Sequence, residues 1–137
     1  MRAFLVFAAL LAFLFAGAAQ AQTALDAAAE RFVGAKRAEI SAIAADIAAT
    51  RDPRAFDLLT ALLDGRLYTR KSDDALVVAE RIEKGFALTD ALTGADLGEV
   101  GRRAVRKIGI NNKLRGELRG LLGGLQLSAP DPAQRMA

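Results

Sequence analysis

The chain has 137 residues, of which 19 are basic and 16 are acidic, and it contains neither histidine nor cysteine. One domain is expected at this length. The composition excludes Ser-His-Asp and Cys-His catalysis, disulfide bonds and the usual zinc sites. The charge is unevenly distributed along the chain, because the segment from Gly101 to the end contains 8 basic and only 2 acidic residues. This basic segment favours either a solvated helix face or a contact with anionic lipid headgroups or an acidic partner.

The first 21 residues have the pattern of a secretory signal peptide. Met1-Arg2 precedes an apolar run from Ala3 to Ala16, and Ala19-Gln20-Ala21 is an A-x-A cleavage signal. The apolar run is shorter than the roughly 20 residues that a membrane span needs. The sequence therefore predicts cleavage before Gln22, with an uncleaved anchor or a buried core helix as the alternatives.

A helical pattern follows from Thr23 to Ala49. Gly34 interrupts it and marks a bend or a break, so either one long helix or two short ones are expected. The apolar stripe comprises Leu25, Ala28, Ala29, Phe32, Ile40, Ile43, Ala44 and Ile47.

A second helical segment begins at Asp52-Pro53 and ends at Gly65. The Asp52 carboxylate can cap this helix, and Pro53 suits the first helical position because it has no N–H to leave unpaired. Gly65 suits the position just after the helix. The segments within 22–65 are expected to form a HEAT-like helical pair. The expected contacts place Ile40, Ile43 and Ile47 against Phe56, Leu59 and Leu63.

A β-hairpin is predicted next. Arg66 to Arg70 alternates polar and apolar residues, Ser72-Asp73-Asp74 is a turn cluster, and Ala75 to Ala79 is a second strand-like run. The candidate interaction surface lies on this hairpin and consists of Arg66, Tyr68, Arg70 and Lys71. An aromatic ring between two guanidinium groups is a common interface anchor. The alternative is that Tyr68 covers the helical pair while the arginines are solvated.

The rest of the chain is expected to be loop and helix. Within the insert at 66–100, Glu80 to Lys84 is interpreted as a charged loop, and Phe86 and Leu88 as a short third strand. The segment 101–128 is expected to be helical, with Asn111 or Asn112 able to cap its main helix and Asn112 assigned as the cap. Residues 129–137 are interpreted as the truncated start of a further repeat. The predicted fold class is therefore mostly α: a HEAT-like helical hairpin with an inserted β-hairpin and a C-terminal helix.

No catalytic, metal-binding or cofactor-binding site is predicted. Asp73-Asp74 lacks a Gly-spaced ligand loop, so it favours a turn over a cation site. The G-x-G-x-x-G phosphate-binding fingerprint is absent. We therefore expect a protein that is not an enzyme.

Three blocks of the sequence carry a family resemblance when taken together: LLDGRLYTRK at Leu62–Lys71, LTDALTGADLGEV at Leu88–Val100, and INNKLR at Ile110–Arg115. They are followed by the Asp-Pro at Asp131-Pro132. In this combination, the chain resembles the N-terminal extracytoplasmic segment of the urea ABC-transporter permease, a subunit related to branched-chain amino-acid permeases. With the leader, the resemblance covers nearly the whole chain.

The resemblance implies a role in interaction or positioning, without a cofactor. The implied partners are other subunits of a urea ABC transporter, including the periplasmic binding protein, while ATP hydrolysis would belong to separate cytoplasmic subunits. The family places its membrane-spanning body after the Asp-Pro, and this sequence ends at Ala137. Membrane association is therefore expected only through that body or an uncleaved leader, and the location is periplasmic or at the inner membrane. Nucleic acid is not an expected partner of an exported chain. The alternative is a free-standing periplasmic protein-interaction module.

Overall fold

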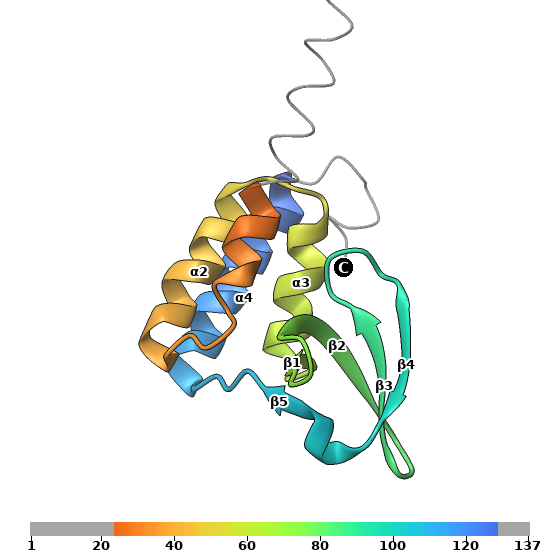
Figure 1. The fold of residues 1–137 in the computed structure, drawn as a ribbon. Coiled ribbons are helices and arrows are strands. Elements are labelled where there is room, and N and C mark those ends of the chain that lie inside the picture. The colour runs from red at the N-terminus through yellow and green to blue at the C-terminus, as the bar shows by residue number, and fades with distance from the viewer. Residues whose placement is uncertain (1–23, 129–137) are drawn as a thin grey trace, which may run out of the picture.

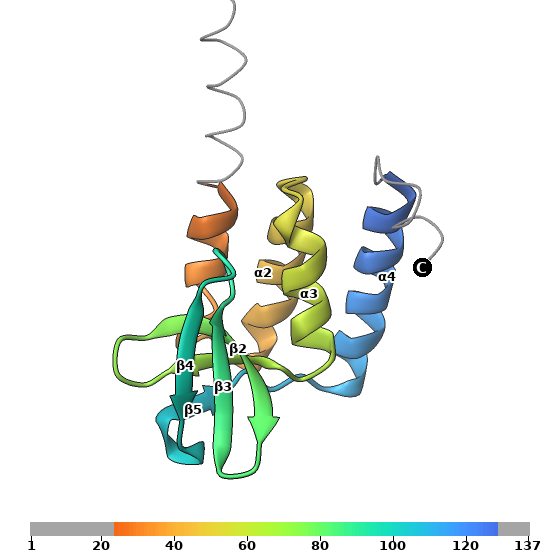
Figure 2. The ribbon, with the colours of Figure 1, turned by 90° about the vertical axis from the view of Figure 1, so that its right-hand side faces the viewer.

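The computed structural model describes residues 24–128 and shows a mixed α/β fold (Figure 1). Within this range, five antiparallel strands form one sheet with the order β4-β3-β2-β1-β5. The helices gather on one side of the molecule, and the sheet lies against their lower ends (Figures 1 and 2). The prediction of a mostly α fold, built on a HEAT-like helical hairpin with a β-hairpin insert, is therefore wrong. After a helix at 24–30, the elements are α2 (Arg37–Ala49), α3 (Arg54–Leu63), β1 (Leu67–Arg70), β2 (Ala75–Ile82), β3 (Gly85–Asp90), β4 (Asp96–Val100), the 3₁₀ helix η1 (Arg102–Ala104), β5 (Val105–Lys107) and α4 (Asn112–Ser128).

The first helical pattern divides into two helices, because the helical conformation is interrupted before α2 by a turn that ends at Gly34. This glycine has φ of +72°, a left-handed conformation that ends the helix at 24–30 before α2 begins. The Arg31 Nη1 atom lies 2.6 Å from an Asp46 carboxylate oxygen, which links the end of the first helix to the last turns of α2. The two-helix alternative of the sequence pattern is thus the one adopted.

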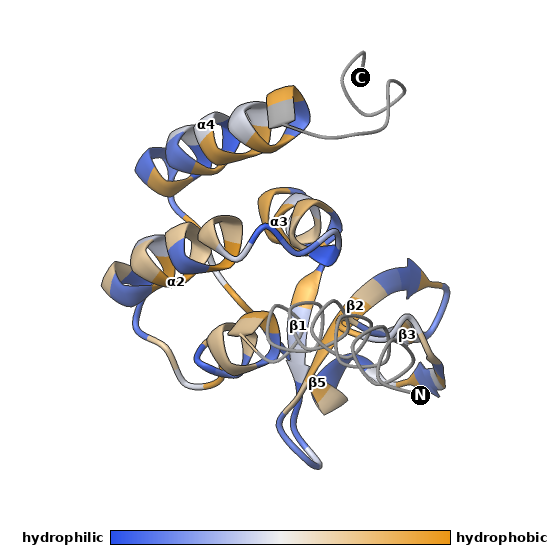
Figure 3. Ribbon diagram, turned by 90° about the horizontal axis from the view of Figure 1, so that it is seen from above, coloured by the Kyte–Doolittle hydropathy of each residue, from blue (hydrophilic) through white to orange (hydrophobic). Residues whose placement is uncertain are grey.

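The helical core is made by three helices rather than by one pair. Leu114, Leu118 and Leu122 of α4 are buried against both α2 and α3, and the apolar side of α4 faces those two helices (Figure 3). On α3, the inward positions belong to Leu58 and Leu62 together with the expected Leu59. The expected contacts of Phe56 and Leu63 are only peripheral, because both residues are partly buried and lie at the edge of this core.

The predicted hairpin is present, and its second strand is longer than expected. Strands β1 and β2 pair in antiparallel register from Leu67 opposite Val78 to Arg70 opposite Ala75. Pairing of β2 with β3 then continues to Ile82 opposite Gly85. Glu80 and the next two residues are thus in a strand and not in a charged loop, since an exposed strand can carry charged side chains.

Two further strands arise where a loop and a helical turn were predicted. Strand β4 is short and largely exposed, so its apolar alternation is weak. Strand β5 has three residues and pairs only with β1, about 37 residues earlier in the chain. A pairing over that separation leaves no local pattern in the sequence, which explains why the segment before α4 was interpreted as helical. In the described structure it forms η1 and β5 instead.

Alternating residues along the strands of the sheet belong to two separate apolar clusters, one on each face. Leu67 and Leu76 join the helical core, whereas Tyr68 and Val77, the next residues along each strand, join a second cluster on the other face. The second cluster consists of Val77, Ala79, Phe86, Leu88 and Val105, with Tyr68, Ala75, Leu97 and Val100 at its edge. The sheet therefore packs on both faces, although each strand is short.

Two segments of the prediction lie outside the described residues. These are the signal peptide at 1–21 and the truncated repeat start at 129–137.

The junction between α3 and β1 is a Schellman turn at Gly65. The Gly65 N–H donates to the Leu62 carbonyl at 3.2 Å, and the Arg66 N–H donates to the Ala61 carbonyl at 2.9 Å. Gly65 has φ of +72°, and a Cβ at this position would lie 3.0 Å from the Lys107 ammonium nitrogen. The prediction of Gly65 as the residue after the helix agrees with this geometry.

We expect Gly65→Ala to lower the free energy of unfolding by about 1–2 kcal/mol, because an L-residue pays this cost in the left-handed region. Chemical denaturation followed by circular dichroism would measure the change. Gly116→Ala is the matched control, since Gly116 is an exposed residue inside α4 with no atom within 4 Å of an added Cβ. That variant should gain roughly 0.5–1 kcal/mol. Equal effects of the two substitutions would contradict the assigned turn.

Candidate functional site

The predicted interaction surface does not form one convergent site. Arg66 lies just before β1, Tyr68 and Arg70 belong to β1, and Lys71 follows it. The structure gives each of these side chains different surroundings, so they are described separately.

The two arginines of this surface are engaged by carboxylates of the chain itself. Arg66 donates to Glu80 at 2.8 Å and to Asp64 at 3.1 Å. The hydrogen bond to Glu80, followed by that to Asp64, raises the pKa of Arg66 against the opposing effect of desolvation. Arg70 binds Asp73 through two hydrogen bonds of 2.9 Å and 2.6 Å. The guanidinium groups thus hold the hairpin in shape instead of being free for a partner.

Tyr68 is a packing residue of the second cluster. Its ring centroid lies 5.2 Å from that of Phe86, with 47° between the ring planes. This tilted arrangement is a favourable aromatic contact. The alternative prediction that Tyr68 covers the helical pair is wrong, because the residue packs on the opposite face of the sheet.

Lys71 is exposed and lies beside the basic η1 segment. Its backbone N–H donates to the Ala104 carbonyl at 2.9 Å. Among the three cations of the predicted surface, Lys71 is the one for which the described part of the chain provides no carboxylate within 4 Å.

Asp52 has a larger structural role than the predicted helix cap. Its carboxylate is buried and accepts the Arg54 backbone N–H at 2.9 Å, which satisfies a free donor at the start of α3. The same carboxylate also binds the Arg54 guanidinium, with oxygens at 3.1 Å and 2.8 Å. Pro53 precedes the first residue of α3 with φ of −55°, one position earlier than predicted.

Arg54 connects three separate parts of the fold. Besides Asp52, its Nη1 atom lies 3.0 Å from the Asp26 carboxylate of the first helix and donates to the Leu92 carbonyl at 3.3 Å. Leu92 lies in the turn between β3 and β4. The Arg54 side chain therefore joins the helical core to the sheet.

The cap of α4 is Asn111 and not Asn112. The Asn111 Oδ1 atom accepts the Leu114 N–H at 2.8 Å. Asn112 is already the first residue of the helix, and its Oδ1 atom is 3.4 Å from an Arg115 nitrogen. Both asparagines were candidates in the sequence, and their one-residue offset could be resolved only by the helix geometry.

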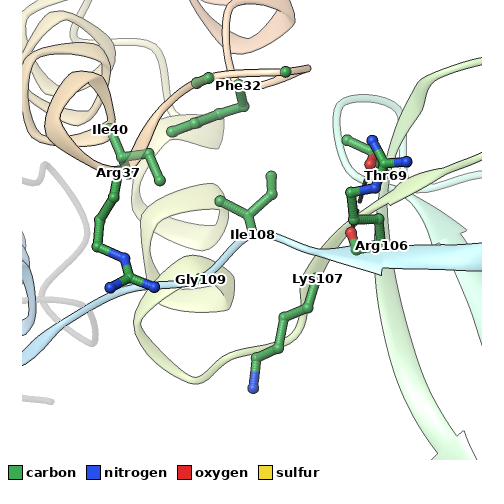
Figure 4. Close-up of a pocket in the computed structure, with 10 residues that line it drawn as sticks. Phe32, Arg37, Ile40, Thr69, Arg106, Lys107, Ile108 and Gly109 are labelled. Carbon is green, nitrogen blue, oxygen red and sulfur yellow. Dashed lines mark hydrogen bonds between the residues drawn. The ribbon is translucent and has the colours of Figure 1, made fainter.

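A pocket that the sequence analysis did not predict lies between β5 and the turn that precedes α2. Its volume is about 340 Å³. Figure 4 shows Phe32, Ile40 and Ile108 pointing toward one another in its centre, with Arg37 on one side and Arg106 on the other. The remaining lining residues include Thr69 and Lys107. This lining combines apolar and cationic groups and contains no carboxylate.

A second recess of about 510 Å³ adjoins the first and shares Arg37. It lies between α2 and the start of α4. Its single acidic residue, Glu117, accepts a hydrogen bond from the Ser41 hydroxyl, and Lys113 adds a further cation. Together, the two recesses are lined by the cations Arg37, Arg106, Lys107 and Lys113 and by one carboxylate, that of Glu117.

The described residues contain no group of three or more His, Cys, Asp or Glu side chains that could hold a metal ion. In the same range, no helix is long and apolar enough to cross a membrane. Comparison with protein-family models, with curated proteins and with solved structures found no match to this chain.

We expect Asp52→Asn to lower the free energy of unfolding by roughly 1–3 kcal/mol at pH 7, because it removes the charge that the buried hydrogen bonds stabilise. The hydrogen bond from Arg54 holds the pKa of Asp52 below its ordinary value of 3.8. The charged form therefore stabilises the fold above pH 3.8, and this contribution is lost as the pH falls through the folded pKa. Urea denaturation at pH 7 and near pH 3 would measure the free energy of unfolding of both proteins. The difference in this free energy between Asp52→Asn and the wild type should be smaller near pH 3 than at pH 7.

Asp74→Asn provides the control for this experiment. Asp74 is exposed, and its φ of +56° is a conformation that asparagine also tolerates. The free energy of unfolding of the Asp74→Asn variant should differ little from that of the wild type at either pH. A loss for Asp52→Asn that stayed constant with pH would show that packing, and not charge, is responsible.

The Arg70–Asp73 pair should be visible in a carboxylate titration. The hydrogen bonds from Arg70 lower the pKa of Asp73 to about 2. In Arg70→Gln, we expect this pKa to rise toward 3.8, whereas Arg66→Gln should leave it unchanged because Arg66 binds other carboxylates. A ¹³C-detected NMR titration of the side-chain carboxyl would measure both. The stabilising contribution of the pair is present above pH 3.8 and is lost as the pH falls through about 2.

Proposed function

We propose that this chain is the extracytoplasmic N-terminal part of a urea ABC-transporter permease subunit. Its role there is interaction or positioning, without catalysis or a cofactor. The observation that carries the proposal is the position of the three sequence blocks in the fold: each contains the residues that build a turn or a cap.

The first block, Leu62–Lys71, covers the end of α3, the Gly65 turn and β1. It also supplies Arg66, whose ion pair with Glu80 links the residue before β1 to β2, and Arg70, whose ion pair with Asp73 lies at the turn after β1. These residues thus determine how the helical core passes into the sheet.

The second block, Leu88–Val100, forms the β3–β4 hairpin. The Asp90 Oδ1 atom accepts the N–H groups of Leu92 at 2.8 Å and Thr93 at 2.9 Å. Gly94 then has φ of +76°, and the Asp96 side chain accepts the Gly98 N–H at 2.9 Å. Aspartate and glycine at such positions specify turns because each satisfies a backbone requirement that other residues do not.

The third block, Ile110–Arg115, provides the Asn111 cap that starts α4. Taken together, the blocks coincide with fold-determining positions spread over the described chain. Because the turns and caps depend on these particular residues, the blocks act as structural motifs in this chain, and this supports the resemblance on which the proposal rests.

The partners that follow are the other subunits of the transporter, including its periplasmic binding protein. On this proposal, the chain is exported and reaches the membrane through a permease body or an uncleaved leader. ATP hydrolysis remains with separate cytoplasmic subunits.

Urea uptake by the cells that encode this chain tests the proposal. We expect an in-frame deletion of codons 24–128 to reduce uptake of ¹⁴C-urea supplied at micromolar concentration, and re-expression of the complete gene to restore it. The same cells should take up a labelled branched-chain amino acid normally, which controls for general damage to the envelope. Normal urea uptake after the deletion would overturn the proposal and favour a free-standing periplasmic interaction module, the role that the cationic pocket supports independently.

A further inference from the structure

The pocket beside β5 has an apolar centre that is recessed below its cationic edge. Phe32, Ile40 and Ile108 are 2%, 3% and 7% exposed, respectively, so none of them projects from the surface. Arg37 and Arg106 are exposed on either side of them (Figure 4). A ligand for this pocket must therefore bring an apolar group inward and place negative charge at the edge.

The cations of this pocket are not neutralised by the described chain. No carboxylate among residues 24–128 lies within 4 Å of Arg37, Arg106 or Lys107. By contrast, Arg31, Arg54, Arg66 and Arg70 each have a carboxylate partner at 3.1 Å or less. What distinguishes the pocket cations from other cations without a carboxylate partner in the described chain, such as Arg102 and Arg103, is that they line an apolar recess.

Lys107 has a structural reason for its position. Its ammonium group lies near Gly65, at the carboxyl end of α3, where a positive charge is favoured by the helix dipole. Arg106 belongs to β5, and Arg37 is the first residue of α2, at the amino end of a helix, where the dipole does not favour a positive charge. These two residues are therefore the ones assigned to a ligand.

The neighbouring strand offers a free backbone edge. Strand β5 is the last in the sheet order, and it pairs with β1 alone. The Ile108 N–H donates to Leu67, and the Ala104 carbonyl accepts from Lys71. Because hydrogen bonding alternates along an antiparallel strand, the backbone groups of Val105 and Lys107 point to the open edge. An extended peptide can add to such an edge and place alternate side chains in adjacent pockets.

We propose that the pocket between β5 and the turn preceding α2 binds an extended acidic peptide segment of a partner protein. One apolar side chain of the peptide occupies the space bounded by Phe32, Ile40 and Ile108, and flanking carboxylates bind Arg37 and Arg106. The volume of about 340 Å³ is at the small end of the range for ligand pockets and suits a single large side chain with its neighbours. A membrane surface fits less well, because the apolar groups here are recessed and cannot insert into a bilayer.

This inference deepens the proposed interaction role, and its test is independent of urea transport. The probe is a fluorescein-labelled nonapeptide with four glutamates on either side of a central leucine. Fluorescence anisotropy with the purified full-length protein would give its affinity. Two control peptides replace either all glutamates by glutamine or the leucine by glycine, and both should bind at least about tenfold more weakly if charge and apolar contact act together.

A pair of variants with equal change in net charge separates the pocket from general attraction. Arg37→Glu with Arg106→Glu should weaken binding of the leucine peptide by about tenfold or more. Arg102→Glu with Arg103→Glu reverses two exposed arginines of η1 outside the pocket lining and should weaken it by less than about threefold. Circular dichroism would establish that both variants are folded.

Amide NMR shifts of the wild-type protein provide a readout that does not depend on any variant. The peptide should shift the resonances of Gly34, Ile108 and Gly109, all at the pocket, more than those of η1. Equal losses in the two charge variants, or shifts confined to η1, would overturn the assignment. Absence of peptide binding would also overturn it. If vesicles of phosphatidylglycerol bind instead, and the Arg37→Glu, Arg106→Glu variant no longer binds the vesicles, the pocket is a lipid site. The two proposals can fail separately. If the purified protein binds the peptide as expected but deletion of codons 24–128 leaves urea uptake unchanged, this inference stands and the transporter proposal is refuted.

Discussion

The turn at Gly65 is the constraint on which the rest of the structure depends. It ends α3 with two backbone hydrogen bonds and directs the chain into β1, so that Leu67 enters the helical core while Tyr68 lies on the opposite face of the sheet. Since a shift of one residue would exchange these two faces, the turn also fixes which side chains of β1 enter the helical core. The ion pairs of Arg66 with Asp64 and Glu80 reinforce the same junction from outside.

A second connection joins the helices to the far side of the sheet through Arg54. Its guanidinium contacts the first helix, the start of α3 and the turn before β4. A charged group is costly to bury unless its hydrogen bonds are satisfied, and here Asp52 satisfies several of them. Arg31, Arg54, Arg66 and Arg70 are thus held in ion pairs within the fold, whereas Arg37 and Arg106 line the pocket without a carboxylate partner among the described residues. That division is the basis for assigning the interaction role to the pocket rather than to the hairpin face.

The family resemblance and the pocket depend on different residues. The resembling blocks contain turn and cap residues, such as Asp90 and Asn111, whose contacts are internal to the fold. These residues specify turns and caps of the fold and do not specify a ligand. The pocket, by contrast, is lined by residues from 32–40, by Thr69 of β1 and by residues from 106–109, and its chemistry points to an acidic partner. A periplasmic subunit of a transporter and a partner of a free-standing module would both be able to supply such a segment.

The sequence by itself determined the local features of this protein. The interruption at Gly34, the Gly65 turn and the β1–β2 hairpin follow from backbone preferences and periodicity that act within about ten residues, although the choice between a bend and a break at Gly34 stayed open. Only the tertiary structure decided that β5 pairs with β1, that Glu80 continues a strand, and that Tyr68 packs against Phe86. The same holds for the pocket, where Phe32 and Arg106 come together across more than half of the chain. Such contacts depend on which surfaces remain to be buried after the local elements form, and that is a property of the assembled fold and not of any stretch of sequence.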